Sequence, residues 1–263
     1  VTSCVRLYGL ENPKYMTGNL IVDRLTTLMQ RFHLAVRTVE LSDANLLALS
    51  GPDGSPSHLV FFTAEDAQIG PTEGVILSAK VEWSGQNNPF LAALPPRVDY
   101  DLTQSAEAQS LVHLMLDEAQ GRRCGAESVI NRLGEVLMVR LLRDQIKRGA
   151  TEAGLLAGLS DLRLSRAIVA MHDHPGRQWS TADLASEAGL SLSRFSELFG
   201  AEVGETPMGY LRRWRLVLAH QDLQRGDRVD AVARRYAYGS PEGFSRAFRR
   251  VYGVAPVALR RVG

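Results

Sequence analysis

Two stretches in the C-terminal half of the chain share one pattern of apolar residues, glycine and proline. In Gly239–Pro256, two phenylalanines stand one helical turn apart and are followed by a glycine and then a proline. The same four positions occur 49 residues earlier: Phe195, Phe199, Gly204 and Pro207 correspond to Phe244, Phe248, Gly253 and Pro256. Phenylalanines at this spacing predict the inner face of a helix, the glycine its end, and the proline the start of another turn or helix. The pattern therefore predicts two copies of one helical unit.

A shorter helix precedes the first of these stretches. Thr181–Ala188 follows Ser180, which can cap the helix, and Asp183 stands where it completes a capping box. Gly189 allows the positive φ angle of a tight turn, and a following serine can cap the next helix. Two short helices joined in this way predict a helix-turn-helix unit.

The second copy repeats the arrangement with Val229–Tyr236, a turn of four residues and a helix at Pro241–Tyr252. A long helix, predicted at Met208–Gln224, joins the two copies. If the second helix of each unit enters a major groove of the same duplex, the two lie about one helical turn, roughly 34 Å, apart. We therefore expect the two units to read successive segments of one DNA duplex.

The N-terminal half has a different pattern. Apolar residues at helical spacing predict a helix at Gly18–Phe32. Four short apolar or β-branched runs follow, separated by turns rich in glycine and proline: Leu34–Leu41, Asn45–Ser50, His58–Thr63 and Val75–Trp83. Such runs predict a small antiparallel sheet or barrel. Pro89–Pro96 is interpreted as a connector.

Two amphipathic helices, Ser105–Gln120 and Ala126–Lys147, are predicted to form a hairpin after this sheet. The second carries an apolar face made of Ile130, Leu133, Val136, Leu137, Met138 and Leu141. This face can pack on the sheet of its own chain or pair with a second chain, and periodicity favours neither. Arg148–Leu159 is rich in glycine and alanine and loses the helical pattern, so we expect a boundary between domains at residues 1–150 and 151–263.

Charge is divided unevenly between the two halves. Residues 158–263 carry 16 arginines, no lysine and 11 acidic residues, a net charge of +5, whereas residues 1–157 carry 14 basic and 18 acidic residues, a net charge of −4. Guanidinium groups suit phosphate and guanine. The excess is modest, so it supports nucleic-acid binding only together with the helix-turn-helix pattern.

The sequence offers little enzyme chemistry. It lacks a glycine-rich phosphate loop and a G-x-S-x-G motif, and His33, His58 and His113 show no paired metal-ligand spacing. We therefore predict no catalytic residue, no metal site and no cofactor. His172 and His174 are interpreted as helix-terminal residues that interact with the helix dipole.

The two cysteines, Cys4 and Cys124, form no disulfide framework. Cys124 stands beside Arg122 and Arg123, whose charges would favour a thiolate, so a redox role is a minor alternative to two incidental thiols.

The residues from 184 to 256 resemble the DNA-binding domain of the AraC/XylS transcriptional regulators. The resemblance lies in LASEAGLSLSRFSELFGAEVGETPMGYLRRWRLVLAHQDL at 184–223 and VARRYAYGSPEGFSRAFRRVYGVAP at 232–256. It implies contacts with base edges from Ser193, Ser196, Glu197, Glu242 and Arg246. It implies phosphate contacts from Arg194, Arg249 and Arg250.

Two positions depart from the pattern of that family. Ala237 stands where its turn usually has glycine, so we expect a strained or shifted turn. Gly243 lies in the second recognition helix and lowers helix stability by about 1 kcal/mol relative to alanine.

The N-terminal half resembles the cupin-type sensory domain of one AraC subgroup, through NPFLAALPPRVDYDL at 88–102 and the two helices that follow. This implies an α+β chain: a cupin-like β-barrel with a helical hairpin, then an all-α domain with two helix-turn-helix units. It also implies a homodimer formed through residues 105–147. The metal-binding histidines of cupin enzymes are missing, which favours a pocket for a non-metal effector, or no pocket.

We therefore predict a transcriptional regulator that binds double-stranded DNA and responds to a small-molecule effector, with RNA polymerase as a further partner. The alternatives are a cupin-like enzyme and a regulator without a ligand that a protein partner controls. The N-terminus lacks the pattern of a signal peptide and no apolar run is long enough to cross a bilayer, so we expect a cytoplasmic protein without membrane contact.

Overall fold

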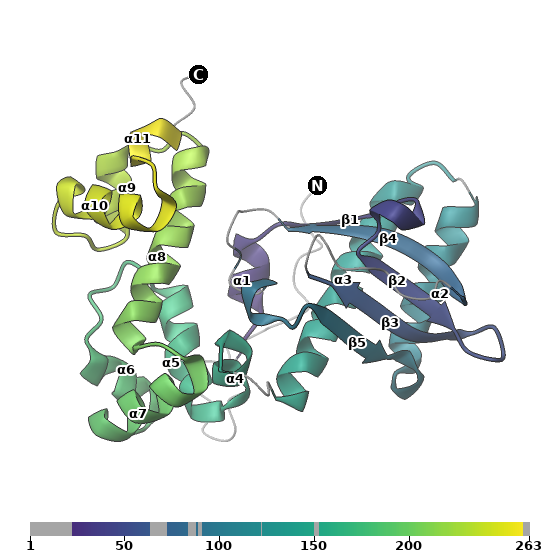
Figure 1. The fold of residues 1–263 in the computed structure, drawn as a ribbon, viewed down its shortest axis with the longest axis horizontal. Helices are drawn as coiled ribbons and strands as arrows, with labels where there is room; N and C mark the ends of the chain where they lie inside the picture. The colour runs from purple at the N-terminus through teal and green to yellow at the C-terminus, as the bar shows by residue number, and fades with distance from the viewer. Residues whose placement is uncertain are drawn as a thin grey trace, which may run out of the picture.

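A computed structural model describes residues 23–63, 73–83, 88, 91–121, 123–149 and 153–259 of the 263-residue chain. Figure 1 shows a β-sheet domain beside a helical domain, with α1 between them. None of the helices in these residues is long and apolar enough to cross a membrane.

The N-terminal domain contains one five-stranded antiparallel sheet with the order β1-β4-β2-β3-β5. Its strands are β1 (Leu34–Thr38), β2 (Leu46–Ser50), β3 (Pro56–Phe62), β4 (Val75–Trp83) and β5 (Arg97–Asp101). Three pairs define the register across the sheet: Val36 with Val81, Leu46 with Ala79, and Leu59 with Tyr100. The predicted β-rich, cupin-like domain is confirmed, as are the four predicted strands within a few residues at their ends.

Strand β5 was not among the predicted strands. Val98 and Tyr100 face the core, whereas Arg97 and Asp99 are exposed and form an ion pair of 2.8 Å. The alternation of apolar and charged residues that is typical of a strand is therefore present. It was not recognised because three of the five residues are charged and the segment follows the proline-rich connector. The connector itself contains a short 3-10 helix, η2 (Leu91–Ala93), and the helices η1 (Leu41–Asp43) and η3 (Leu102–Gln104) flank other strands.

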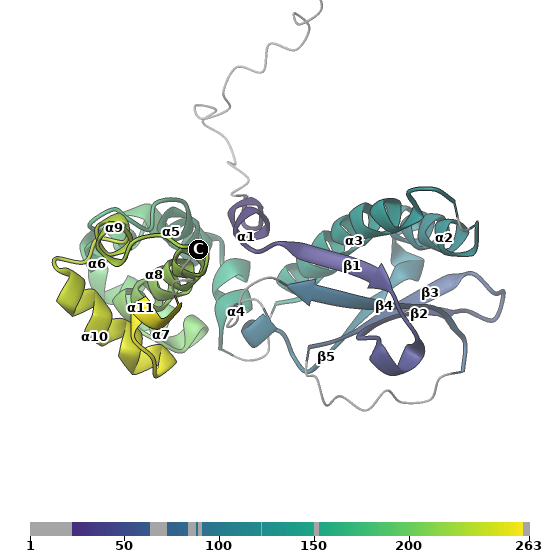
Figure 2. The ribbon, with the colours of Figure 1, turned by 90° about the horizontal axis from the view of Figure 1, so that it is seen from above.

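Helices α2 (Ala106–Gly121) and α3 (Ala126–Arg148) form the predicted hairpin and cover one face of the sheet (Figure 2). At Gly134 of α3 a β-carbon would lie 2.6 Å from Val36, so the missing side chain allows the helix to approach β1 closely. Asn131 accepts a hydrogen bond of 2.7 Å from the backbone N–H of Val36. Val136, predicted on the inner face of α3, is 48% exposed instead, because Gly134 takes part in the inner face.

The helix predicted at Gly18–Phe32 is shorter at its start than expected. Residues 18–22 lie outside the described residues, and α1 begins only at Thr26 and ends at Arg31. The carboxylate of Asp23 accepts a hydrogen bond of 3.0 Å from the backbone N–H of Thr26, which fixes this starting point.

The C-terminal domain is entirely helical in its described residues. Its helices are α4 (Leu155–Ser160), α5 (Leu162–Asp173), α6 (Thr181–Ala188), α7 (Leu192–Val203), α8 (Pro207–Gln224), α9 (Val229–Arg235), α10 (Pro241–Tyr252) and α11 (Pro256–Leu259). All the helices predicted here are confirmed. Residues Arg148–Leu159, where the helical hydrophobic pattern is lost, nevertheless contain the last residue of α3 and most of α4. Helix α4 buries Leu155, Leu156 and Leu159, because both domains supply apolar surface there.

The two domains meet at α1. The ring of Phe32, just after α1, lies 5.8 Å from that of Trp214 in α8. The hydroxyl of Thr27 donates a hydrogen bond to the carboxylate of Asp173 at the end of α5. A polar contact and an aromatic contact therefore connect the β-sheet domain with two helices of the helical domain.

Candidate nucleic-acid interface

The first helix-turn-helix unit, α6 and α7, is closed by local hydrogen bonds that the sequence supplies. Ser180 caps α6 and forms a reciprocal capping box with Asp183, with bonds of 3.1 and 2.8 Å. Gly189 ends α6 with φ 67°. Ser191 accepts a hydrogen bond of 3.4 Å from the backbone N–H of Arg194 and starts α7. The turn geometry therefore follows from residues that are local in sequence.

The second unit, α9 and α10, repeats the order of this construction, but α9 starts after Arg228 without a side-chain cap. Ser240 caps α10 by accepting a 3.1 Å hydrogen bond from the backbone N–H of Gly243, which places Gly243 in the first turn of the helix. The turn before it contains Ala237 with φ 59°, the one non-glycine residue with positive φ in the described chain. The strain expected at Ala237 is therefore present, since side chains with a β-carbon disfavour this region.

Buried phenylalanines hold both recognition helices, α7 and α10, against the domain. The rings of Phe195 and Phe199 lie 5.5 Å apart, and those of Phe244 and Phe248 lie 5.6 Å apart, all fully buried. Helix α8 runs between the two units (Figure 1), and α7 and α10 lie on the same side of α8 (Figure 2). The exposed face of each recognition helix is thus accessible to a partner on the same side of the domain.

Arg215 of α8 fixes the loop between α5 and α6. Its guanidinium donates hydrogen bonds of 2.7 Å to the backbone oxygens of Pro175 and Arg177. Between these residues, a β-carbon on Gly176 would lie 2.3 Å from the backbone oxygen of Arg235 at the end of α9. The loop that leads to the first unit therefore touches the second unit, which sets the two units relative to each other.

The arginines of α8 differ in their contacts. Arg213 donates a hydrogen bond of 3.0 Å to Glu205, and Arg215 is engaged with backbone oxygens. Both side chains therefore support the fold, whereas Arg212 is exposed on α8.

The residues predicted to contact DNA from the first unit all lie exposed on α7. Arg194 and Glu197 form an ion pair of 2.9 Å. The hydroxyl of Ser196 donates a hydrogen bond of 2.9 Å to the backbone oxygen of Leu192. Ser193 is exposed near the start of the helix. This surface therefore has an internally neutralised charge pair and two small hydroxyl groups.

The second unit presents a basic surface. Glu242, Arg246, Arg249 and Arg250 are exposed on α10, and with Pro241 and Ser245 they line a concave surface with a volume of about 640 Å³. Hydrogen bonding by its own backbone N–H and by Ser240 lowers the pKa of Glu242, and nearby Arg246 adds to the effect. Three arginines around one carboxylate suit an anionic partner such as a nucleic-acid backbone.

His172 has a different role from the one predicted. It is fully buried, its Nε2 atom lies 2.6 Å from the hydroxyl of Tyr210, and its ring lies 4.2 Å from that of Trp214. Burial, with a smaller contribution from Arg213, lowers the pKa of His172 to about 3. The interaction with the helix dipole is therefore wrong for His172, which is a neutral core residue at pH 7.

Cys124 is a free, exposed thiol in the turn between α2 and α3. Its neighbour Arg123 forms an ion pair of 3.0 Å with Glu118. Cys4 lies outside the described residues. A redox role for either cysteine stays a prediction.

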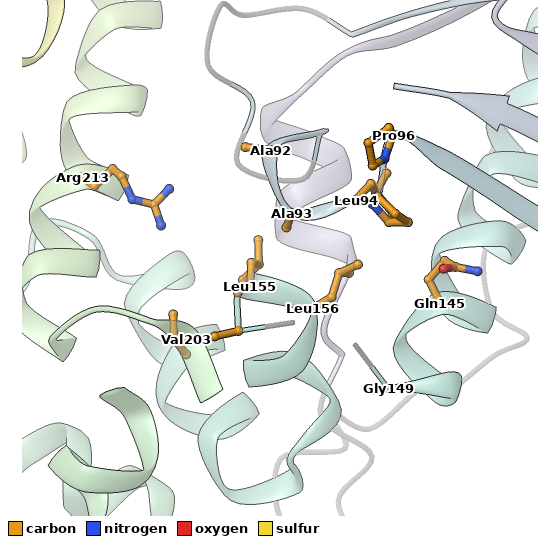
Figure 3. A pocket seen from close by; sticks show the side chains of 13 residues that line it. Ala92, Ala93, Leu94, Pro96, Gln145, Gly149, Leu155, Leu156, Val203 and Arg213 are labelled. Carbon is orange, nitrogen blue, oxygen red and sulfur yellow. The ribbon is translucent and has the colours of Figure 1, made fainter. Parts of the chain in front are cut away.

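A cavity with a volume of about 450 Å³ lies where the two domains meet (Figure 3). Apolar side chains from both domains line it, together with Gln145 of α3 and Arg213 of α8. The apolar set is Leu94, Pro95, Pro96, Leu155, Leu156 and Val203, together with Ala92, Ala93 and Ala153. Since Val203 is the last residue of α7, the cavity borders the end of a recognition helix.

The fold and this surface define a class, the helix-turn-helix transcription regulators, and comparison with known proteins agrees. Residues 184–262 match the family described as "Helix-turn-helix domain", and residues 37–147 match the family described as "Cupin". An AraC-like transcription regulator of Streptomyces lividans is 34% identical over 222 residues, which cover 81% of this chain and 73% of the relative. The chain therefore belongs to the family of AraC-like DNA-binding transcription regulators, which are regulators and not enzymes.

Two further similarities are less extensive. An AraC-like transcription regulator of Streptomyces antibioticus is 34% identical over 176 residues, which cover 65% of this chain and 58% of the relative, so the chain spans less than two thirds of that protein. The crystal structure of the DNA-binding domain of AdpA in complex with a target DNA is 30% identical, with 35% of this chain and 84% of that chain covered and a TM-score of 0.34.

Three residues of the interface were not identified from the sequence. Gly176 and Arg215 carry no local pattern that reveals their roles, because their partners lie about 40 to 60 residues away in the chain. Leu192 was also overlooked, although the 49-residue repeat places it at the position of Pro241 and could have found it.

Proposed function

We propose that this chain recognises a specific DNA sequence with both recognition helices at once. Ser193, Ser196, Glu197, Glu242 and Arg246 would contact base edges. Arg194, Arg249 and Arg250 would contact phosphates, which supply most of the affinity, while base contacts supply the preference. We take residues 1–150 as a sensory and dimerisation domain and residues 151–263 as the DNA-binding domain.

One observation carries this proposal: α7 and α10 lie on the same side of α8, and α10 exposes three arginines, Arg246, Arg249 and Arg250. Arg246 has the planar fork that can donate two hydrogen bonds to O6 and N7 of guanine. Exposed guanidinium groups in the middle and the last turn of one recognition helix suit the major groove and its phosphates.

Selection of bound sequences from random double-stranded DNA by the full chain tests the proposal. We expect a motif with two conserved segments separated by about one helical turn, and binding that weakens as salt rises. A chain that retains DNA without enriching any sequence would contradict it. The double variant Arg249→Ala, Arg250→Ala should bind the same motif more weakly, and Arg37→Ala, an exposed arginine of the sheet domain, serves as the matched control.

We also propose that the chain forms a homodimer through α2 and α3. Leu114 of α2 and Val129 and Val136 of α3 are large apolar side chains that are at least 41% exposed. Val129 and Val136 stand seven residues apart and so lie on the same face of α3. An exposed apolar stripe of this kind on a helical hairpin suits pairing with a second copy.

Analytical ultracentrifugation of the Val136→Glu variant, with Val257→Glu as the control, tests whether the chain forms this dimer. Val257 is an exposed valine of the helical domain, so its substitution adds the same charge away from α3. We expect the Val136 variant to shift toward monomer at concentrations where the control stays dimeric. A monomeric wild-type chain would contradict the proposal.

We propose further that a small molecule with an apolar body and one anionic or polar group acts as the effector, and that it binds the cavity between the domains. Gln145 and Arg213 supply polar groups among apolar walls. Helix α4, which lines the cavity, packs on the end of α7: the N–H of Gly154 donates a 2.8 Å hydrogen bond to the backbone oxygen of Glu202. An occupant would therefore contact both domains and a helix that reads DNA.

The melting temperature of the full chain, measured with and without fatty acids, aromatic acids and amino acids, tests this proposal. A stabilising compound should lose its effect in Ala93→Phe, because Ala93 of η2 lines the cavity and the larger side chain would fill it. The variant should still bind the selected DNA. Stabilisation that Ala93→Phe leaves unchanged would place the effector elsewhere. A chain that no compound stabilises favours the alternative of a regulator controlled by a protein partner.

Finally, we propose that the chain acts in the cytoplasm, where its DNA lies, and that it changes the activity of RNA polymerase at promoters with its motif. Transcription in vitro from such a promoter, with and without the chain, measures the direction of the effect. An unchanged transcript level would contradict this part of the proposal.

A further inference from the structure

Leu192 is an apolar residue at a place where a DNA-binding helix meets bases. It is the first residue of α7, directly after the capping Ser191, and it is 52% exposed. In a helix-turn-helix unit the first residues of the recognition helix approach the base edges in the major groove. The side chain is therefore positioned for contact with DNA and not for packing in the domain.

In the second unit the equivalent position lies on the surface for which we propose contact with DNA. In α10 the concave surface is lined by Pro241, Glu242, Ser245 and Arg246, along with Arg249 and Arg250. The 49-residue repeat relates the first four of these to Leu192, Ser193, Ser196 and Glu197. Both helices begin directly after a capping serine, Ser191 or Ser240, so the correspondence holds in the structure as well as in the sequence.

The other groups on this surface of α7 are limited in what they can read. Ser196 donates its proton to the backbone oxygen of Leu192 and is left with acceptor positions only. Glu197 is held by Arg194 in an ion pair. Unlike α10, this surface carries no arginine at the position of Arg246, so a guanine-reading fork is missing there.

We infer that Leu192 recognises a thymine through its 5-methyl group. The thymine methyl is the apolar feature that a base presents in the major groove, and it is distinct from the hydrogen-bonding edges of the other bases. Contact removes both apolar surfaces from water. The inference rests on the proposed recognition of DNA and adds to it the base that the start of α7 prefers.

The probe is the duplex that the full chain selects from random DNA, with each thymine replaced in turn by deoxyuridine. Deoxyuridine keeps base pairing and lacks only the methyl group. We expect one thymine at which this replacement weakens binding by the wild-type chain about fourfold, the value of burying one methyl group. Leu192→Ala should bind thymine and deoxyuridine equally at that position. Leu162→Ala, an exposed leucine at the start of α5, should keep the wild-type difference.

The outcomes separate this inference from the proposed function. A chain that selects no sequence contradicts the proposed function itself. A chain that selects a motif, while Leu192→Ala discriminates thymine from deoxyuridine as the wild type does, overturns the role of Leu192 alone. The preference for one segment of the motif should be unaffected by Arg246→Ala, and this is the segment assigned to α7. If that segment contains no thymine, the role of Leu192 is overturned as well. Alanine favours helices, and the melting temperature of Leu192→Ala confirms that the variant is folded.

Discussion

The ring of Phe32 lies 5.8 Å from the ring of Trp214 at an angle of 53°, and this pair joins the β-sheet domain to the helix between the two DNA-binding units. Both side chains are almost completely buried. Trp214 also contacts His172, so the contact reaches the core beneath the first unit. The N-terminal domain is therefore in contact, through Trp214, with the centre of the helical domain.

Substitution of Phe32 by alanine should lower the free energy of unfolding by about 3–5 kcal/mol, because it leaves a cavity at the domain junction. We also expect thermal unfolding to separate into two transitions, since the domains lose their main aromatic contact. Differential scanning calorimetry measures both effects. Phe32→Leu keeps most of the apolar volume, so its free energy of unfolding should fall by less. A single transition at the wild-type temperature for Phe32→Ala would show that the pair does not couple the domains.

Substitution of Gly176 by alanine should displace the two units relative to each other. The new β-carbon would lie 2.3 Å from the backbone oxygen of Arg235, a contact that neither backbone can relieve easily. We expect a loss of about 1–3 kcal/mol in unfolding free energy, as in other overpacked sites. Gly239→Ala is the matched control, because a β-carbon there meets nothing within 4 Å. Equal melting temperatures for the two variants would contradict this assignment.

Ala237→Gly should stabilise the chain by about 1 kcal/mol, since Ala237 has φ 59° and glycine adopts this conformation without the cost of a β-carbon. Chemical denaturation measures the change. The control is Ala201→Gly on the exposed side of α7, where glycine should destabilise the helix by about 1 kcal/mol. The two substitutions are chemically identical, so opposite signs report the backbone conformation; the same sign in both would argue against strain at Ala237.

The helical domain was predictable from sequence because its signals are local. Ser180 and Asp183 form their capping box three residues apart, and the buried pairs Phe195–Phe199 and Phe244–Phe248 stand four apart. Such spacings carry their physical meaning without knowledge of the fold.

The roles of arginines could not be read in the same way. Arg215 and Arg246 look alike in the sequence, yet Arg215 bonds backbone oxygens 38 and 40 residues away, whereas Arg246 is exposed. Charge alone gives no partner, so the distinction requires tertiary structure. For the same reason the approach of Gly134 to Val36 and the burial of α4 between the domains became visible only in the fold.

The buried His172 should make stability depend on pH below neutrality. In the unfolded chain its pKa is near 6.5, whereas in the folded chain it is lowered to about 3. Between these values the unfolded state binds one proton more, so stability is present above pH 6.5 and falls by about 1.4 kcal/mol for each pH unit below it. His172→Gln should flatten this dependence between pH 6.5 and 4, and His113→Gln, at an exposed position, should not. Denaturant unfolding across this range gives the slopes, and parallel slopes for wild type and His172→Gln would contradict the prediction.

Arg246→Ala should relax the sequence preference at one position of the selected motif by about 1–3 kcal/mol, because alanine removes the fork that would bond guanine O6 and N7. Arg249→Ala, three residues further along α10, should instead weaken binding to all sequences nearly uniformly and reduce the slope of log affinity against log salt by about one. Both arginines are exposed, so neither substitution disturbs the core. Binding of each variant to the selected duplex and to its single-base variants separates the two roles. Uniform weakening by Arg246→Ala would make Arg246 a phosphate contact, and the preference of the second unit would then rest with Glu242.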